Sequence, residues 1–152
     1  MRAFKFRAEA ALDLRRRDEQ RAATELAGVQ ARFYEANEAV LTMERQRALA
    51  MATQVAQAQH GVDAATMFWH RNWIDRLRAS VDDLRTSARQ RAGEVEAAER
   101  AWRLARQRSL ALGRMRERAV ARYRADERRE ELKSIDELAR LRYTMPELGR
   151  ED

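Results

Sequence analysis

Helix-breaking residues are scarce, and this scarcity constrains the fold of the chain more than any other feature. The sequence of 152 residues holds five glycines and one proline, and Gly61 and Pro146 are the two strong breaks. Alanine, arginine, glutamate, leucine and glutamine dominate elsewhere, and these side chains lose little rotamer freedom in a helix. The sequence therefore predicts a single all-α domain over 1–152, composed of helix 1 at about 6–59, a turn at about 60–64, helix 2 at about 65–142 and a tail at 143–152.

Apolar residues recur at alternating steps of three and four in both helices, which is the spacing of a coiled-coil seam. In helix 1 the seam comprises Leu26, Val29, Phe33, Ala36, Val40 and Met43. The pattern then shifts to Ala48, Met51, Val55, Ala58 and Val62, and such a shift predicts a stutter that locally unwinds the supercoil. In helix 2 the seam comprises Leu77, Val81, Leu84, Ala88, Arg91, Val95, Ala98, Trp102, Ala105, Ser109 and Leu112.

The turn should fold the two helices back against each other. Gly61 suits the left-handed position that follows a helix, and Asp63 or Thr66 can cap the start of helix 2. Two long helices joined by so short a turn pack antiparallel, with the numbers of facing residues adding up to about 124. Large side chains then mostly meet small ones, and the expected pairs are Trp102 with Ala22 and Ala23, Leu26 with Ala98, Val29 with Val95, Val40 with Leu84, and Trp73 with Met51.

Helix 2 is longer than helix 1, so its C-terminal part lacks a helix of the same chain to pack against. In the antiparallel register the first residue of the chain reaches only to about residue 123. From about Arg124 onward, a solitary helix carries Leu132, Ile135, Leu138 and Leu141. Such apolar side chains favour burial against another molecule.

No residue pattern of an enzyme, a cofactor site or a metal site occurs in the sequence. Cysteine is absent, and there is no phosphate-binding glycine loop, dinucleotide fingerprint or catalytic triad motif. The histidines His60 and His70 would need Asp63 and Asp75 to complete a metal site, and solvated polar side chains explain them better. We therefore expect a non-enzymatic protein without cofactors.

The N-terminal sequence and the lack of long apolar runs indicate in which cellular compartment the protein works. Charges recur between Met1 and Arg7 too early for the apolar core of a signal peptide. No apolar run approaches the roughly 20 residues that cross a bilayer. With the absence of cysteine, these features predict a cytoplasmic protein that is at most peripheral on a membrane.

Phe68, Trp69 and Trp73 form an aromatic cluster shortly after the turn. Three large aromatic side chains within two helical turns cannot all face one narrow seam. They either close the turn end as a hydrophobic plug or form an exposed patch that binds a partner, and the sequence leaves both interpretations open.

Arginines are concentrated between Arg114 and Arg129, a stretch that the antiparallel register places beside the basic N-terminus. Its members are Arg114, Arg116, Arg118, Arg122, Arg124, Arg128 and Arg129, and their neighbours are Arg2, Lys5, Arg7, Arg15, Arg16 and Arg17. The stretch fits a solvated face, a surface for an acidic protein or, less well, a nucleic-acid site. Acidic residues such as Glu9 and Asp13 interrupt it, so no nucleic-acid partner is expected.

Four segments of the sequence resemble the FliJ family, the small coiled-coil proteins of flagellar type III export, which are similar to the stalk proteins of injectisomes. The segments are Phe4-Lys5-Phe6-Arg7, Leu12 to Arg17 followed by Glu19 and Ala22-Ala23, Ala101-Trp102-Arg103, and Lys133-Ser134-Ile135-Asp136-Glu137. The resemblance covers nearly the whole chain. Leu132 departs from it, because the family often has glutamine at this position, so the C-terminal motif is incomplete.

The resemblance implies a hairpin like the coiled coil of the rotary ATPase γ subunit, acting as a stalk at the cytoplasmic side of the membrane at the flagellar base. The implied partners are the flagellar export ATPase hexamer, the export gate membrane protein and substrate-specific export chaperones. The ATPase is expected to contact Arg128, Leu132, Ile135, Asp136, Glu137 and Leu138. On the positions that match the family, the gate would contact Met43, Trp73 and Leu77. The alternative is a homodimeric scaffolding coiled coil with no export role.

Overall fold

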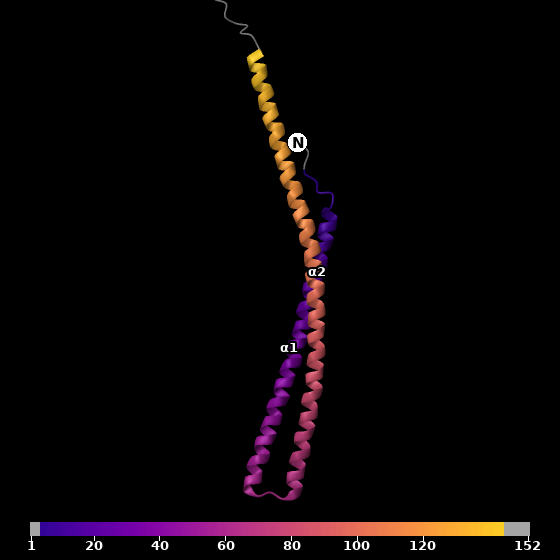
Figure 1. Cartoon of the computed structure of the whole chain (residues 1–152), viewed down its shortest axis with the longest axis vertical. Helices are drawn as coiled ribbons and strands as arrows, with labels where there is room; N and C mark the ends of the chain where they lie inside the picture. Colours follow the sequence, from indigo (N-terminus) through magenta and orange to yellow (C-terminus); the bar gives the residue numbers. More distant parts are fainter. Residues whose placement is uncertain (1–3, 145–152) are drawn as a thin grey trace, which may run out of the picture. The chain divides into compact units, whose positions relative to one another are not determined.

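Two long helices make up nearly all of residues 4–144, which are the residues that the computed structural model describes. Helix α1 spans Glu9–His60 with 52 residues, and helix α2 spans Ala64–Thr144 with 81 residues (Figure 1). The prediction of an all-α antiparallel hairpin with a longer C-terminal helix is confirmed. The first helix begins later than residue 6, because the Glu9 amide first donates to the Phe6 carbonyl, 3.2 Å away, in a turn.

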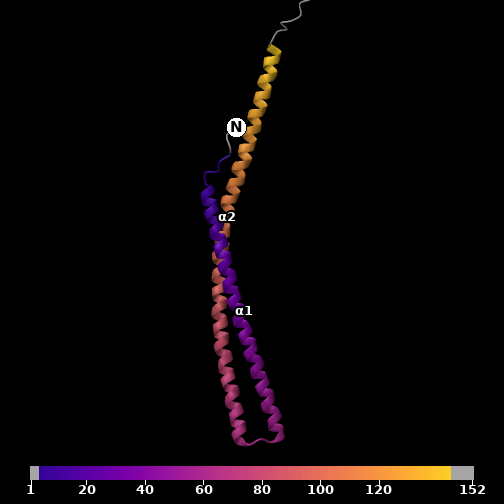
Figure 2. The same cartoon turned by 180° about the vertical axis from the view of Figure 1, so that it is seen from behind.

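The contacts divide the chain into two compact units. One unit joins the first part of α1, up to Arg16, to the part of α2 that begins at Gln107. The other unit runs from Arg17 to Arg106 and contains the connection between the helices. Within each unit, α1 and α2 lie side by side and run in opposite directions (Figures 1 and 2).

The connection between the helices has the predicted chemistry. Gly61 adopts a φ of 76°, in the left-handed region that glycine tolerates without steric cost. Asp63 caps α2, since its Oδ1 accepts a hydrogen bond from the Thr66 amide over 2.8 Å. The Thr66 hydrogen bonds lower the pKa of the Asp63 carboxyl below its ordinary value of 3.8, because they stabilise the charged form.

Contacts between the helices agree with the predicted register. The pairs joined across the two helices are Glu9 with Arg116, Glu44 with Arg85, Gln54 with Met67, and Gln57 with His70. Their residue numbers add up to between 121 and 129, close to the expected 124. The turn position therefore determines which residues face each other within each unit.

The buried apolar side chains follow the predicted seam. The core comprises Leu12, Val29, Val40, Leu77, Val81 and Ala88. Every predicted seam position of α2, from Leu77 to Leu112, is buried or half-buried, and so are the predicted positions of α1 from Leu26 to Met43. Period-3.5 spacing of apolar residues thus identified the packed faces over most of the chain.

The predicted stutter in α1 is wrong. Met51 and Val55 are 45% and 58% exposed, and Ala48 and Ala58 are exposed as well. The seam instead continues in phase through Arg47, Ala50, Gln54 and Gln57, all of which are half-buried. Gln54 Nε2 donates to Met67 Sδ over 3.6 Å, and His70 Nε2 donates to Gln57 Oε1. Polar side chains form this part of the seam, so the spacing of apolar residues predicted the wrong face of the helix.

Trp102 is half-buried rather than enclosed in the seam. The Arg106 guanidinium carbon lies 5.2 Å from the centre of the Trp102 ring, at cation–π distance. The indole is therefore covered on one side by an arginine of its own helix.

Candidate partner-binding surfaces

A shallow apolar groove lies between the helices near the turn. Its volume is about 350 Å³, and it is lined by Gln46, Leu49, Ala50, Thr53, Trp69, His70, Trp73 and Leu77. Trp69 and Trp73 stack with their ring centres 6.5 Å apart and their planes 12° apart. Trp69 also meets the His70 ring edge-on. A groove with stacked tryptophans and one aliphatic wall can accept an apolar side chain from a partner.

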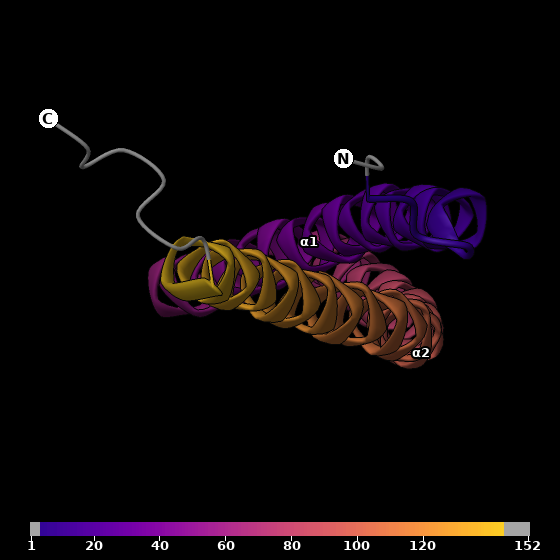
Figure 3. The same ribbon diagram turned by 90° about the horizontal axis from the view of Figure 1, so that it is seen from above.

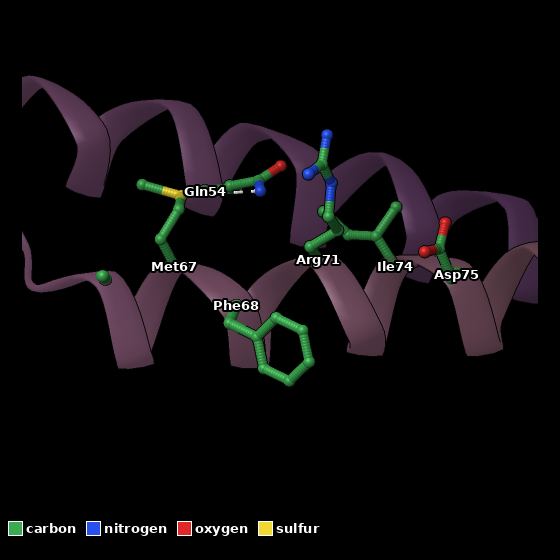
Figure 4. Close-up of a pocket in the computed structure, with 7 residues that line it drawn as sticks. Gln54, Met67, Phe68, Arg71, Ile74 and Asp75 are labelled. Carbon is green, nitrogen blue, oxygen red and sulfur yellow. Dashed lines mark hydrogen bonds between the residues drawn. The ribbon is translucent and has the colours of Figure 1, made fainter.

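The aromatic cluster does not close the turn end as a plug. Phe68 and Trp69 are 66% and 62% exposed, and Trp73 is 43% exposed. Phe68 lies apart from the tryptophan groove, in a second groove with Gln54, Met67, Arg71, Ile74 and Asp75 (Figure 4). Figure 4 shows its ring turned away from α1. The exposed-patch interpretation is therefore the one that the side-chain positions support.

Residues 48–70 carry a single charge, that of Asp63, although 37% of the whole chain is charged. The exposed apolar side chains Leu49, Met51 and Val55 lie in this segment. Depletion of charge together with exposed aromatic and aliphatic side chains is the composition of the centre of a protein interface. This run of uncharged residues is visible in the sequence, and it would have predicted that Leu49 belongs to the same exposed apolar surface as the aromatic cluster.

The three residues predicted for gate binding have different environments. Trp73 is exposed and lines the tryptophan groove. Leu77 also lines it but is 4% exposed, so most of its side chain belongs to the core. Met43 is half-buried and is not among the residues that line the groove. The groove therefore joins Trp73 and Leu77 and leaves Met43 out.

The C-terminal part of α2 extends past the first turns of α1, and Figures 1 and 2 show no helix beside its last turns. Every described side chain from Arg128 to Tyr143 is exposed. This segment, the C-terminal helix, contains the predicted ATPase-binding residues Arg128, Leu132, Ile135, Asp136, Glu137 and Leu138. Lys133 Nζ lies 2.8 Å from Glu130 Oε1, and this hydrogen bond raises the pKa of the lysine.

The apolar residues of the C-terminal helix do not share one face. Leu132, Ile135, Leu138 and Leu141 recur every three residues and are each between 60% and 64% exposed. An α-helix turns by roughly 100° per residue, so each three-residue step falls about 60° short of a full turn. Four such residues are spread over about half of the circumference. One partner helix cannot cover them all, whereas a surface that surrounds the helix can.

Most side chains of the arginine-rich stretch are exposed to solvent. Residues 107–129 contain eight arginines and three acidic residues, and the side chains of Arg114, Arg118, Arg122, Arg124, Arg128 and Arg129 are exposed. Arg116 instead pairs with Glu9, where the first turns of α1 lie beside α2 (Figure 3). Phe4 packs against Tyr123, with ring centres 5.5 Å apart. Arg2 lies outside the described residues.

Neither a metal centre nor a membrane span is found in the part of the chain that the structure describes. In residues 4–144, no group of three histidine or acidic side chains could hold a metal ion. His60 Nδ1 instead donates to the Ala56 carbonyl, 2.8 Å away. No described helix combines the length and apolarity that crossing a membrane requires.

One comparison with known proteins gives a match. A family model described as "Flagellar FliJ protein" matches residues 4–147, which is nearly the whole chain. Neither a curated protein nor a solved structure matches the chain.

Proposed function

The chain belongs to the FliJ family, a non-catalytic family of the flagellar protein export apparatus, and we propose that it acts there as a stalk and adaptor. In this proposal the C-terminal helix enters the ring of the export ATPase, and the tryptophan groove binds the export gate membrane protein. The chain also hands substrate-specific export chaperones to the gate. It works in the cytoplasm, peripheral to the membrane at the flagellar base.

The spread of exposed leucines and isoleucine around the C-terminal helix carries the ATPase part of the proposal. A helix held inside a ring meets partner side chains on several sides, which suits apolar residues at three-residue steps. The exposed arginines between Arg114 and Arg129 add positive charge beside this helix, and they suit an acidic rim on the ring.

The same spacing argues against the alternative of a homodimeric scaffold joined through this segment. A two-stranded coiled coil needs apolar residues at alternating steps of three and four, so that one stripe faces the partner along its whole length. Steps of three alone rotate the stripe away from a single partner within two turns. Membership of the FliJ family also contradicts a scaffold without an export role.

The tryptophan groove supports the gate part of the proposal. Trp69 and Trp73 offer rigid, exposed anchors, and the surrounding segment is uncharged. Interfaces concentrate their binding energy in such anchors. The proposal assigns Trp69, Trp73 and Leu49 to direct contact with the gate, and Leu77 to the support of the groove.

Binding of the purified chain to the export ATPase tests the first part. We expect Leu132→Gln, Ile135→Gln and Leu138→Gln together to abolish binding, because the variant helix keeps only Leu141 of the four apolar residues at these steps. Leu104→Gln with Leu110→Gln is the matched control, since both leucines are exposed on α2 outside the C-terminal helix. A triple variant that is helical by circular dichroism and still binds the ATPase normally would exclude insertion of this segment.

Binding to the cytoplasmic domain of the export gate protein tests the second part. Trp69→Ala with Trp73→Ala should lose gate binding and keep ATPase binding, whereas truncation after Arg129 should do the opposite. Phe68→Ala is the matched control, because this exposed aromatic residue lies outside the tryptophan groove. If both variants stay folded and each loses both partners, two separate binding surfaces do not exist.

A further inference from the structure

One exposed face of α2 is lined with arginines and has no acidic residue. Residues 107–122 contain four arginines with exposed side chains, and Ala111 and Met115 are exposed on the same side of the helix. An α-helix turns by roughly 100° per residue, so these six residues fall within an arc of about 120°. We call them the arginine face: Arg108, Ala111, Arg114, Met115, Arg118 and Arg122. Glu117, the single acidic residue of this stretch, lies about 120° round the helix from Ala111.

The four guanidinium groups of the arginine face make no ion pair with a described carboxylate. Arginines on other sides of the same helix do make such pairs. Arg116 pairs with Glu9 over 3.0 Å. Arg129 pairs with Asp126 over 3.6 Å. The unpaired positive charge of this region is therefore concentrated on one side of α2.

The arginine face is directed away from α1. Arg116, which contacts Glu9 of α1, lies about 140° round the helix from Ala111, near the middle of the face. Ser109 lies farther round still and is 7% exposed, whereas Met115 is 54% exposed. A flat surface can therefore approach the arginine face without displacing α1.

We propose that the arginine face binds the surface of a bilayer that contains anionic phospholipids. Planar guanidinium groups match phosphate in geometry and charge. Four to eight basic residues on one helix are enough to hold it at an anionic membrane surface. Met115 and the aliphatic stems of the arginines can enter the boundary between headgroups and acyl chains, while the guanidinium groups stay at the phosphates.

The composition of the arginine face favours lipid over a protein or a nucleic acid. It has no aromatic residue, although protein interfaces and single-stranded nucleic-acid sites both depend on aromatic side chains. Its exposed Met115 lies among the arginines, where a phosphate backbone would offer it no apolar contact. In a fluid bilayer, by contrast, anionic lipids can diffuse to each arginine and acyl chains are available to the methionine.

This inference rests on the proposed membrane-peripheral location only for the presence of a bilayer near the chain. The arginine face ends at Arg122, before the C-terminal helix, and no residue of it lines the tryptophan groove. Purified chain and lipid vesicles are sufficient for its test. Failure of the lipid contact would therefore leave the ATPase and gate contacts of the proposed function untouched.

Co-sedimentation of the full chain with vesicles tests the inference. The chain should bind vesicles of phosphatidylglycerol mixed with phosphatidylcholine, and binding should weaken as salt is added, because salt screens the charges. Changing all four arginines of the arginine face to glutamine should weaken binding by about a hundredfold or more, since each contributes about fivefold. Glutamine keeps the helix propensity of arginine, and circular dichroism checks the fold.

A matched control separates the arginine face from net charge. It removes the same charge from four exposed arginines of α2 that lie among acidic residues: Arg71→Gln, Arg76→Gln, Arg78→Gln and Arg89→Gln. This control should change vesicle binding little, because charges farther than about 10 Å from the membrane are largely screened. The triple glutamine variant of the C-terminal helix should also bind the vesicles normally.

A dye that reports the polarity of its surroundings tests the orientation, and the chain has no cysteine of its own to interfere. The dye on Met115→Cys should emit at shorter wavelength when vesicles are added. On Leu110→Cys it should not, because Leu110 is exposed about 140° round the helix from Met115.

Three results would overturn the inference. One is equal vesicle binding by the natural chain and the variant without the four arginines. Another is equal binding to vesicles of phosphatidylcholine alone. The third is binding of the natural chain to single-stranded RNA but not to the vesicles, which would assign the arginine face to a nucleic acid instead.

Discussion

Arg116 and Glu9 are 107 residues apart in the sequence, yet Arg116 Nε donates a hydrogen bond to Glu9 Oε2 over 3.0 Å. The two residues belong to different helices of the same unit, and their ion pair joins the first turn of α1 to α2. Phe4 precedes α1 in the sequence, and its ring packs against the ring of Tyr123 on α2.

We expect reversal of this ion pair to reveal a small coupling. Arg116→Glu or Glu9→Arg alone should destabilise the fold, and the double swap should restore most of the loss. The side chains are 43% and 44% exposed, so the coupling should be about 0.2–1 kcal/mol, as for other solvent-screened pairs. Urea unfolding of the four proteins measures it. Additive effects of the two single changes would mean that the pair contributes nothing.

A cysteine pair tests the register directly. Leu26→Cys with Ala98→Cys should form a disulfide within one chain, because facing seam positions can approach the required Cα separation. Leu26→Cys with Ala105→Cys is the matched control, since both control positions are half-buried in the seam but lie one heptad out of register. Electrophoresis without reductant reports the internal link. Preferential oxidation of the control pair would show that the register is displaced.

Two glycines should respond to alanine in opposite ways. Gly61 has a φ of 76°, so Gly61→Ala should destabilise the hairpin by about 1–2 kcal/mol. Gly93 lies inside α2 with no atom within 4 Å of a built Cβ, so Gly93→Ala should stabilise by about 0.5–1 kcal/mol. Thermal denaturation followed by circular dichroism compares them. A shift of the same sign for both would contradict the conformational assignment of Gly61.

Removal of a core leucine should cost more than removal of Trp102. Leu77 is 4% exposed, and Leu77→Ala should destabilise the fold by about 2–5 kcal/mol through lost burial and a residual cavity. Trp102 is half-buried and covered by Arg106, so a truncated side chain there leaves a space open to water. Chemical unfolding of both variants provides the ranking. A larger loss for Trp102→Ala would place the indole in the packed seam.

The cap of α2 should make stability depend on acid pH. The pKa of Asp63 is lowered by its hydrogen bonds from Thr66, so its contribution is complete above its ordinary pKa of 3.8 and disappears as the pH falls through the lowered value. Asp63→Asn keeps a capping oxygen but does not titrate. The melting temperature of the natural chain should therefore exceed that of the variant by less at pH 2 than at pH 6. An equal difference at both pH values would exclude this linkage.

The sequence was sufficient to predict the hairpin, its turn and most of its seam. Heptad spacing correctly predicted that Val29, Val40, Leu77 and Val81 are buried, because the seam at these positions is apolar. The combination of Gly61 and Asp63 located the turn, since each residue type suits a specific backbone conformation there. Apolar spacing and turn chemistry thus determine the pairing of the helices without further information.

The prediction failed where polar residues form the seam. Gln54 contacts Met67, and Gln57 contacts His70. The prediction relied on the spacing of apolar residues, so it placed Met51 and Val55 in the seam, although both lie on another, exposed face of the helix. The aromatic cluster was recognised in the sequence, but the groove that joins Trp69 to Leu49 was not. Its lining combines residues from two helices, and only the register, together with side-chain orientation, brings Leu49 opposite the tryptophans.

The polar seam near the turn has a consequence for local opening of the hairpin. Apart from Leu12, the buried apolar residues lie at Val29 and Val40 of α1 and between Leu77 and Ala88 of α2. Arg47, by contrast, has a buried Nε without a hydrogen-bond partner among the described residues. Native-state amide exchange should therefore be slowest around Val40 and Val81 and progressively faster towards Gly61. Local separation of the two helices should therefore begin near the turn, where the tryptophan groove lies, while the helices around Val40 and Val81 stay packed.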